Sequence, residues 1–169
     1  QSNPWGLPSQ SRADWAQGLD VPVWTDASQA AEFDVLFYVG SAASYDPRGQ
    51  KIARAFVQVL RAAGVRFAIL GAAETSTGEC VRRAGNEMLF QTLATQLVEM
   101  LNSLGVKHIV TCDPHAFNSL ANEYPDFGGH WRVEHHSQTI DRLMREGRLA
   151  LAPRFERVIF HDPCYLARH

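Results

Sequence analysis

Short apolar runs alternate with helical segments along most of this chain. Residues 33–39 (FDVLFYV) are apolar almost throughout and have the length of a strand. Residues 47–63 instead place apolar side chains three and four positions apart, as on one face of a helix. The alternation predicts strands at 33–39, 66–70, 107–111, 131–134 and 157–160, with helices at 47–63, 81–104, 114–123 and 138–146. In the first two helices the expected inward residues are Ile52, Phe56, Val59, Leu60 and Ala63, then Leu89, Leu93, Leu97, Leu101 and Leu104.

The predicted strands are apolar on both faces, which is typical of a parallel sheet that helices cover on its two sides. The predicted fold class is therefore α/β, with a parallel sheet of about five strands flanked by helices, as in flavodoxin-like or Rossmann-like domains. Residues 1–30 are polar and rich in Trp, Pro and Ser, with at most a short helix at 12–19. They are predicted to form a lead-in linker.

Composition narrows the classes of partner. The chain has 169 residues, is 46% hydrophobic and carries a net charge of −2, so we expect a single folded core and no nucleic-acid partner. No apolar run approaches the roughly 20 residues of a membrane span, so no membrane contact is expected. The three cysteines are an odd number without the spacing of a disulfide framework, which favours a reducing, cytoplasmic location.

Residues with chemically active side chains follow each predicted strand. The carboxyl ends of parallel strands share one edge of the sheet, and ligands of open α/β sheets bind along that edge. We therefore expect these residues to converge there. They are Ser41 after the first strand, Ser76 after the second, Asp113 after the third, His135 and His136 after the fourth, and Cys164 after the fifth.

Several of these residues also fit ordinary helix capping. Asp113 precedes a proline at the first position of a predicted helix, which is a strong helix-entry signal. Ser76 and Thr77 likewise suit the cap of a helix that begins near Glu79, and a small-anion site built with backbone N–H groups is the alternative. Cys80 lies in the first turn of that helix, where its pKa could be lowered.

One group at this edge has side chains that bind zinc or iron. It consists of Asp113, His115, His135 and His136, together with Cys112. No pair in the group has the regular ligand spacing of a zinc ribbon or finger, so a structural role in capping and packing is favoured. Cys112 ends an apolar strand and is expected to be a buried hydrophobe.

Three segments resemble the signature segments of the CCG-domain family, the cysteine-rich iron–sulfur oxidoreductases related to the B-type subunit of heterodisulfide reductase. They are GSAASYDPR at 40–48, ETSTGE at 74–79 and TCDPHAFNSLANEYPDFGG at 111–129. In the family these places read roughly GCxxxYDPR, CCG and CPHC, and the cysteines hold an iron–sulfur cluster. Thiolate is the ligand that such clusters require, so the resemblance implies a degenerate domain that holds no cluster. The cysteine positions are filled here by Ser41, Ser76, Thr77, Asp113 and Ala116.

The flanking sequence resembles the same family. Residues 3–22 are similar to the linker that joins a ferredoxin-type domain to the first CCG domain in membrane-associated members, and residues 160–169 are similar to the opening of a second CCG domain. The resemblance thus divides the chain into a lead-in linker at 1–30, a degenerate CCG domain at 31–156 and the truncated start of a second CCG domain at 157–169. It implies that Cys164 is a cluster ligand of that second domain in the parent protein.

The function implied by the resemblance is electron transfer in an iron–sulfur oxidoreductase of the heterodisulfide reductase type. The chain itself would hold no cofactor and would shape the interface that covers a [4Fe-4S]-type cluster of the second domain. The implied partners are the second CCG domain, the ferredoxin-type domain and an electron-transfer flavoprotein, with the parent on the cytoplasmic side of a membrane. The alternative is a module that binds a mononuclear metal or a small ligand at the carboxyl-end edge of the sheet.

Overall fold

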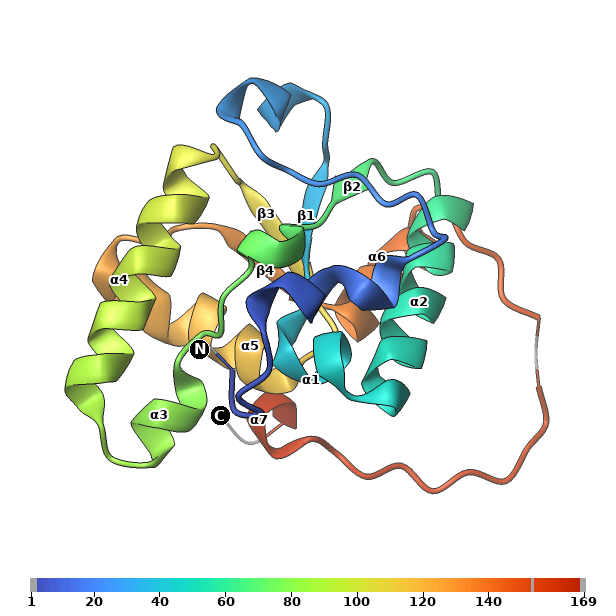
Figure 1. Cartoon of the computed structure of the whole chain (residues 1–169). Coiled ribbons are helices and arrows are strands. Elements are labelled where there is room, and N and C mark those ends of the chain that lie inside the picture. The colour runs from blue at the N-terminus through green and yellow to red at the C-terminus, as the bar shows by residue number, and fades with distance from the viewer. Residues whose placement is uncertain (1–2, 153, 168–169) are drawn as a thin grey trace.

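A parallel sheet with helices on both faces forms the centre of the computed structural model (Figure 1), which describes residues 3–152 and 154–167. The sheet has four strands in the order β2-β1-β3-β4, and every neighbouring pair is parallel. The prediction of an α/β fold with a helix-flanked parallel sheet is confirmed. The strands are β1 (Val35–Tyr38), β2 (Phe67–Ala68), β3 (His108–Thr111) and β4 (Arg132–His135).

Helices lie between consecutive strands, and further helices follow the last strand. Longer helices follow β1, β2 and β4, and shorter ones lie at the carboxyl-end edge of the sheet. The α-helices are α1 (Gly40–Tyr45), α2 (Pro47–Ala62), α3 (Glu79–Arg83), α4 (Glu87–Ser103), α5 (Pro114–Asn118), α6 (His136–Arg145) and α7 (Cys164–Ala167). The 3-10 helices are η1 (Ser9–Ala16), η2 (Ala27–Ala31), η3 (Gly71–Ala73) and η5 (Tyr124–Phe127), and η4 (Ser119–Glu123) is a short π-helix. Among the described residues no helix is long and apolar enough to cross a membrane.

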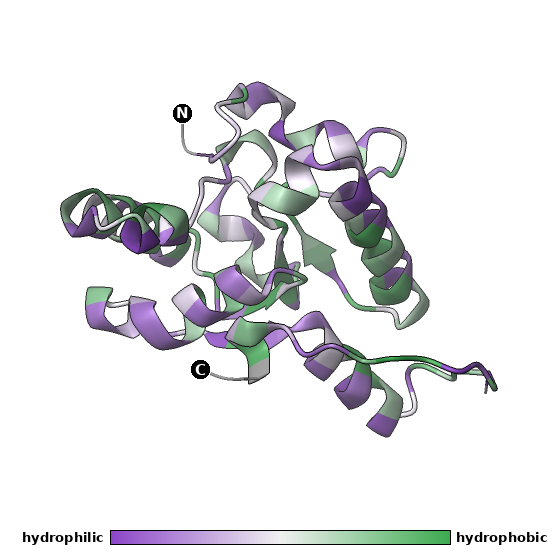
Figure 2. Cartoon of the chain, turned by 90° about the horizontal axis from the view of Figure 1, so that it is seen from below, coloured by the Kyte–Doolittle hydropathy of each residue, from purple (hydrophilic) through white to green (hydrophobic). Residues whose placement is uncertain are grey.

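The sheet separates two apolar layers, which explains why its strands are apolar throughout. Side chains of β1 alternate between them, with Phe37 packed against α2 and Leu36 packed toward α4. Both side chains are fully buried. Figure 2 colours the chain by hydropathy and shows that the helices carry both hydrophobic and hydrophilic residues, while the strands are mostly hydrophobic.

The expected fifth strand at 157–160 is absent, and that part of the prediction is wrong. These residues belong to an extended segment that makes no strand pairing, and Ile159 is 100% exposed. An apolar run has the composition of a strand, but it becomes one only when its backbone groups pair with a neighbour. The sheet therefore has four strands rather than about five.

The expected helix at 81–104 is divided in two. Gly85 adopts a φ of +86°, which ends the first helix, and the side chain of Asn86 accepts a hydrogen bond from Leu89 N (3.0 Å) and caps α4. The buried face of α4 is formed by Phe90, Ala94, Leu97, Val98 and Leu101, and Leu89 lies outside it. Leu89 is consequently 43% exposed, and Ile52 on α2 is 48% exposed, so both were wrongly predicted to face inward.

The segment expected as a lead-in linker packs against the domain. Trp15 and Trp24 are buried, Arg54 donates a hydrogen bond to the carbonyl of Trp15 (2.6 Å), and Trp24 N donates to Ile69 O (2.8 Å) beside β2. The short helix predicted at 12–19 is observed as the 3-10 helix η1, which begins and ends three residues earlier, at Ser9 and Ala16. Residues 1–2 of the expected linker and 168–169 of the expected second domain lie outside the described residues.

The outer strand β4 carries a carboxylate held by several donors. Glu134 accepts hydrogen bonds from Arg142 Nε (3.1 Å), from Thr139 Oγ1 (3.0 Å) and from Arg132. Burial alone would raise the pKa of Glu134, but these hydrogen bonds lower it to about 2. The carboxylate joins β4 to α6 and is ionised throughout the neutral range.

This arrangement predicts an acid-sensitive contribution to stability. Because the folded-state pKa of Glu134 lies below its ordinary value of 4.5, the contribution is present above about pH 4.5 and is lost as the pH falls toward 2. At 1.36 kcal/mol per pKa unit it is about 3 kcal/mol. Unfolding of Glu134→Gln by urea should show that loss at pH 7 and little difference from the unchanged chain near pH 2. Asp141→Asn, which removes an exposed carboxylate on α6, is the control, and equal pH profiles for the two variants would contradict the prediction.

Candidate functional site

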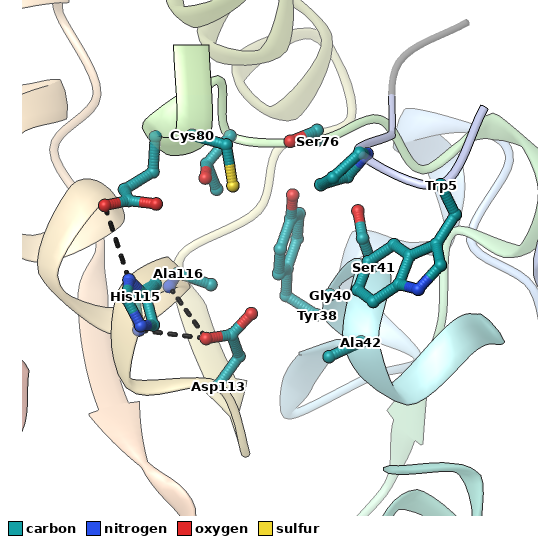
Figure 3. A pocket seen from close by; sticks show the side chains of 13 residues that line it. Trp5, Tyr38, Gly40, Ser41, Ala42, Ser76, Cys80, Asp113, His115 and Ala116 are labelled. Carbon is teal, nitrogen blue, oxygen red and sulfur yellow. Dashed lines mark hydrogen bonds and ion pairs between the residues drawn. The ribbon is translucent and has the colours of Figure 1, made fainter. Parts of the chain in front are cut away.

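A cavity of about 180 Å³ opens at the carboxyl-end edge of the sheet (Figure 3). Its walls come from the N-terminal segment, the turn after β1, the loop after β2 and the turn after β3. Of the residues expected to converge at this edge, Ser41, Ser76 and Asp113 line the cavity, whereas His135, His136 and Cys164 do not. The five positions that the sequence resemblance singled out all lie in these walls. The lining residues are Pro4, Trp5, Tyr38, Gly40, Ser41, Ala42, Ser76, Thr77, Glu79, Cys80, Asp113, His115 and Ala116.

A close approach of two turns sets the width of the cavity. Gly40 has a φ of +80°, and a Cβ atom at this position would lie only 2.9 Å from Oδ2 of Asp113. Glycine satisfies both the backbone conformation and the contact. The turn after β1 and the turn after β3 can therefore lie against each other.

A buried ion pair lies behind the cavity and was not predicted. Arg12 NH2 is 3.0 Å from Glu74 Oε1, and each side chain is only 2% exposed. The carboxylate also accepts hydrogen bonds from Val39 N (2.8 Å) and Gly40 N (2.9 Å), and Arg12 donates to Ser41 Oγ (3.1 Å). The pair thus joins the N-terminal segment, the turn after β1 and the loop after β2.

Burial and pairing act in opposite directions on the pKa of each partner. Burial raises the pKa of Glu74 above its ordinary value, although the Arg12 guanidinium and the backbone hydrogen bonds oppose this shift. Burial would lower the pKa of Arg12, but the Glu74 carboxylate beside it raises the pKa above the ordinary value of a guanidinium. Burial, and then the charge of Glu74, raise the pKa of Tyr38 well above its ordinary value. Tyr38 is therefore a neutral donor, and its hydroxyl binds the carbonyl of Thr75 (2.6 Å).

Asp113 caps α5, as the sequence predicted. Its Oδ1 accepts hydrogen bonds from His115 N (2.9 Å) and Ala116 N (3.4 Å), with Pro114 at the first helical position. These bonds satisfy two of the backbone N–H groups that a helix leaves unpaired at its start. The capping role accounts for the position of the carboxylate.

Ser76 and Thr77 do not cap α3, contrary to the prediction. The N-cap residue is Gly78, with a φ of +75° and no side-chain cap. Ser76 Oγ instead accepts a hydrogen bond from Gly78 N (3.2 Å), and the carbonyl of Thr77 accepts one from the Tyr124 hydroxyl (2.9 Å). Ser76 and Thr77 thus precede α3 without capping it, and both residues line the cavity.

The histidines considered as metal ligands are divided between two places. His115 lines the cavity, with Nδ1 3.3 Å from Glu79 Oε1. His135 and His136 are not among the residues that line it. Their rings lie 4.2 Å apart, and burial followed by the proximity of His136 lowers the pKa of His135 to about 4. In the described part of the chain no three His, Cys, Asp or Glu side chains form a group that could hold a metal ion.

The three cysteines are free thiols in different surroundings. Burial, and then the charge of Glu79, raise the pKa of Cys80, so the lowered pKa considered for a first-turn cysteine is not found. Burial raises the pKa of Cys112 to about 12. Cys164 is exposed on α7 and does not line the cavity.

Comparison with protein families identifies one match. The model of the CCG family, the cysteine-rich domain, matches residues 35–121, just over half of the chain. The matched region runs from β1 to η4 and includes the walls that follow β1, β2 and β3. No solved structure matches the chain.

Curated relatives cover the whole chain. It is 45% identical to the probable iron-sulfur-binding oxidoreductase FadF of Bacillus subtilis, over 100% of the chain and 25% of that protein. Identity is 42% to a probable membrane-anchored ferredoxin of Chromohalobacter salexigens and 39% to the EtfAB:quinone oxidoreductase of Syntrophomonas wolfei, each over 99% of the chain. The chain therefore spans about a quarter of the length of these relatives.

A more distant relative links the chain to heterodisulfide reductase. The D-type subunit of the dihydromethanophenazine:CoB–CoM heterodisulfide reductase of Methanosarcina mazei is 26% identical over 99% of the chain and 40% of that protein. The signature segments resemble a family related to the B-type subunit of heterodisulfide reductase, whereas this relative is a D-type subunit.

The capping role of Asp113 predicts a stability change without a change in bound metal. Asp113→Ala should lower the free energy of unfolding by about 1 kcal/mol, because two backbone N–H groups of α5 lose their acceptor. Asp46→Ala is the matched control, since Asp46 caps α2 in the same way ahead of a proline. Chemical unfolding and elemental analysis of both variants test this. A loss of bound zinc or iron in Asp113→Ala alone would instead assign the carboxylate to a metal site.

Proposed function

Since the chain belongs to the CCG cysteine-rich domain family, we propose that it is the first CCG domain of a longer iron–sulfur oxidoreductase of the heterodisulfide reductase type. In this proposal the domain is degenerate: it holds no cluster of its own and serves electron transfer by shaping the interface over the cluster of a second CCG domain. The names of the relatives support the iron–sulfur oxidoreductase class.

The composition of the cavity wall carries the proposal. The five positions at which the family pattern has cysteine are hydroxyl, methyl or carboxylate side chains that meet at one cavity. Iron–sulfur clusters are usually held by four thiolates. Of the described residues that line the cavity, Cys80 is the only cysteine, and its raised pKa favours the thiol over the thiolate. This composition supports a cavity at the place of the family's cluster that lacks the cluster's ligands.

The arrangement of α7 supports the interface role. α7 packs against α5, and the first residues of α5 line the cavity. Cys164, which we propose as a ligand of the second domain's cluster, is therefore held beside the cavity, although no fifth strand delivers it. That cluster would be of the [4Fe-4S] type, and this chain would close one side of its surroundings.

The proposed partners follow from the relatives' names. The name of EtfAB:quinone oxidoreductase supports an electron-transfer flavoprotein as electron donor. The name of the membrane-anchored ferredoxin supports a ferredoxin-type domain and a membrane anchor in the parent protein. We propose that this domain lies on the cytoplasmic side, as the free cysteines favour.

A second candidate function is the binding of a small ligand at the same edge. The open cavity of about 180 Å³, with hydroxyl groups and a carboxylate in its wall, favours this candidate. An experiment on this chain alone distinguishes the two functions, because the interface role requires the longer polypeptide whereas a small ligand would bind this chain by itself. Mass spectrometry of the native chain, compared with the denatured chain, detects such a ligand.

The first prediction of the proposal is that this chain acquires no iron–sulfur cluster. Anaerobic reconstitution with iron, sulfide and dithiothreitol should leave less than one equivalent of iron after desalting and no visible charge-transfer band, because the cavity lacks a thiolate set. A variant with Ser41, Ser76, Thr77, Asp113 and Ala116 all replaced by cysteine is the positive control. Stoichiometric iron and sulfide in the unchanged chain would overturn the degenerate assignment.

The second prediction concerns Cys164 in the longer protein. Cys164→Ser should remove the electron paramagnetic resonance signal of the second domain's cluster and lower the iron content, because one thiolate ligand is lost. Cys112→Ser, at a partly buried cysteine, should leave that signal in place. An unaltered spectrum of Cys164→Ser would show that Cys164 is not a ligand.

A further inference from the structure

The short helix α7 contacts the edge of the cavity through the aromatic side chain of Tyr165. Tyr165 stacks on the imidazole of His115, with ring centroids 4.1 Å apart and planes inclined by 34°. The guanidinium of Arg83 lies 5.3 Å from the centroid of the Tyr165 ring. Stacking and cation–π contacts of this kind each stabilise an association modestly.

A carboxylate from a third element completes this contact. Glu79 on α3 is largely buried and accepts hydrogen bonds from the Tyr165 hydroxyl and from Arg83 Nε (3.1 Å), and its Oε1 is 3.3 Å from His115 Nδ1. Burial alone would raise the pKa of Glu79, but the hydrogen bond from Tyr165 and the charge of His115 lower it. One carboxylate therefore holds donors from α3, α5 and α7 together.

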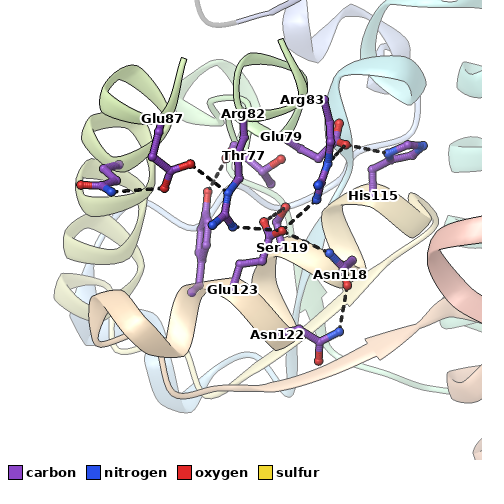
Figure 4. Close-up of polar contacts among 12 residues, drawn as sticks. Thr77, Glu79, Arg82, Arg83, Glu87, His115, Asn118, Ser119, Asn122 and Glu123 are labelled. Carbon is purple, nitrogen blue, oxygen red and sulfur yellow. Dashed lines mark hydrogen bonds and ion pairs between the residues drawn. The ribbon is translucent and has the colours of Figure 1, made fainter. Parts of the chain in front are cut away.

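A second carboxylate fixes the orientation of Arg83. Arg83 NH2 is 3.0 Å from Glu123 Oε1, and Ser119 Oγ donates to the other oxygen of Glu123 (2.9 Å), as Figure 4 shows. The guanidinium is thus held between Glu79 and Glu123, with its carbon over the Tyr165 ring. A fixed guanidinium loses less side-chain entropy on binding an aromatic ring than a free one does.

We infer that Glu79, Arg83 and His115 form a receptor for Tyr165, which we call the tyrosine clasp, and that the clasp positions the neighbouring Cys164 thiol beside the cavity. Cys164 is exposed and directly precedes Tyr165 in α7. The clasp concerns this chain alone, whereas its use in presenting Cys164 to the cluster of the following domain rests on the proposed function. The clasp residues are positioning residues and do not ligate the cluster.

The clasp is tested by the mobility of a nitroxide label on Cys164. The background Cys80→Ser with Cys112→Ala leaves Cys164 as the one reactive thiol, and serine at position 80 keeps a hydrogen-bond donor beside Glu79. In this background the electron paramagnetic resonance spectrum should contain a broad component from a label on an anchored helix. Tyr165→Ala, Arg83→Ala and His115→Ala should each abolish that component, and Tyr165→Phe, which removes only the hydroxyl, should reduce it.

Two control variants show whether loss of any exposed histidine or arginine changes the mobility of the label. His130→Ala removes another exposed histidine, and Arg145→Ala removes an exposed arginine whose partner is Asp141 on the same helix. Both should keep the broad component, and circular dichroism should show that every variant is folded. A label that is equally mobile in the background chain and in the clasp variants would overturn the inference.

The longer protein distinguishes failure of the clasp from failure of the proposed function. If Cys164 is a ligand and the clasp positions it, Tyr165→Ala should lower the cluster's iron occupancy, and Tyr165→Phe should lower it less. If Cys164→Ser leaves the iron signal unaltered, the proposed ligand role fails, while the label experiment on this chain still decides the clasp. Full iron occupancy in Tyr165→Ala, with loss of iron in Cys164→Ser, would show that the clasp does not serve the cluster.

Discussion

The Glu74 carboxylate is the point at which the parts of the cavity wall are joined. It accepts hydrogen bonds from two backbone N–H groups at the end of β1 and from Arg12 in the N-terminal segment, while Glu74 itself belongs to the loop after β2. Replacing one partner of such a buried pair typically costs about 3–5 kcal/mol, because the other charge is left without compensation. The three segments therefore depend on one another for their positions.

Polar and close-packing contacts between protein groups hold this edge of the domain. The Tyr38 and Tyr124 hydroxyls bind the carbonyls of Thr75 and Thr77, and Gly40 lets the turns after β1 and β3 meet. In a domain that holds a cluster, thiolates would link the same turns through iron. In the proposed function, the protein's own polar contacts replace that link and hold the turns that face the second domain in their positions.

The sequence predicted what depends on local pattern and missed what depends on distant pairing. The apolar runs at the first four strands and the Asp-Pro signal at Asp113 were read correctly, because each is a pattern of neighbouring residues. The parallel arrangement followed from a general rule, that strands apolar on both faces and alternating with helices form parallel sheets. The pair of Arg12 with Glu74 spans 62 positions and has no local signature. The apolar run at 157–160 has the composition of a strand, but composition does not show whether a neighbouring strand is present to pair with it. The tyrosine clasp joins three separate segments and was invisible for the same reason.

The extended segment after α6 exposes apolar side chains that could bring copies of the chain together. Phe155, Val158, Ile159 and Phe160 are between 79% and 100% exposed, although their composition favours β structure. Segments of this kind pair with copies of themselves and are a common start of aggregation. Arg154, Glu156 and Arg157 interrupt the apolar run with charge and oppose such pairing. Self-association through this segment therefore depends on a balance between its apolar and its charged residues, and we expect salt, which screens those charges, to shift that balance toward association.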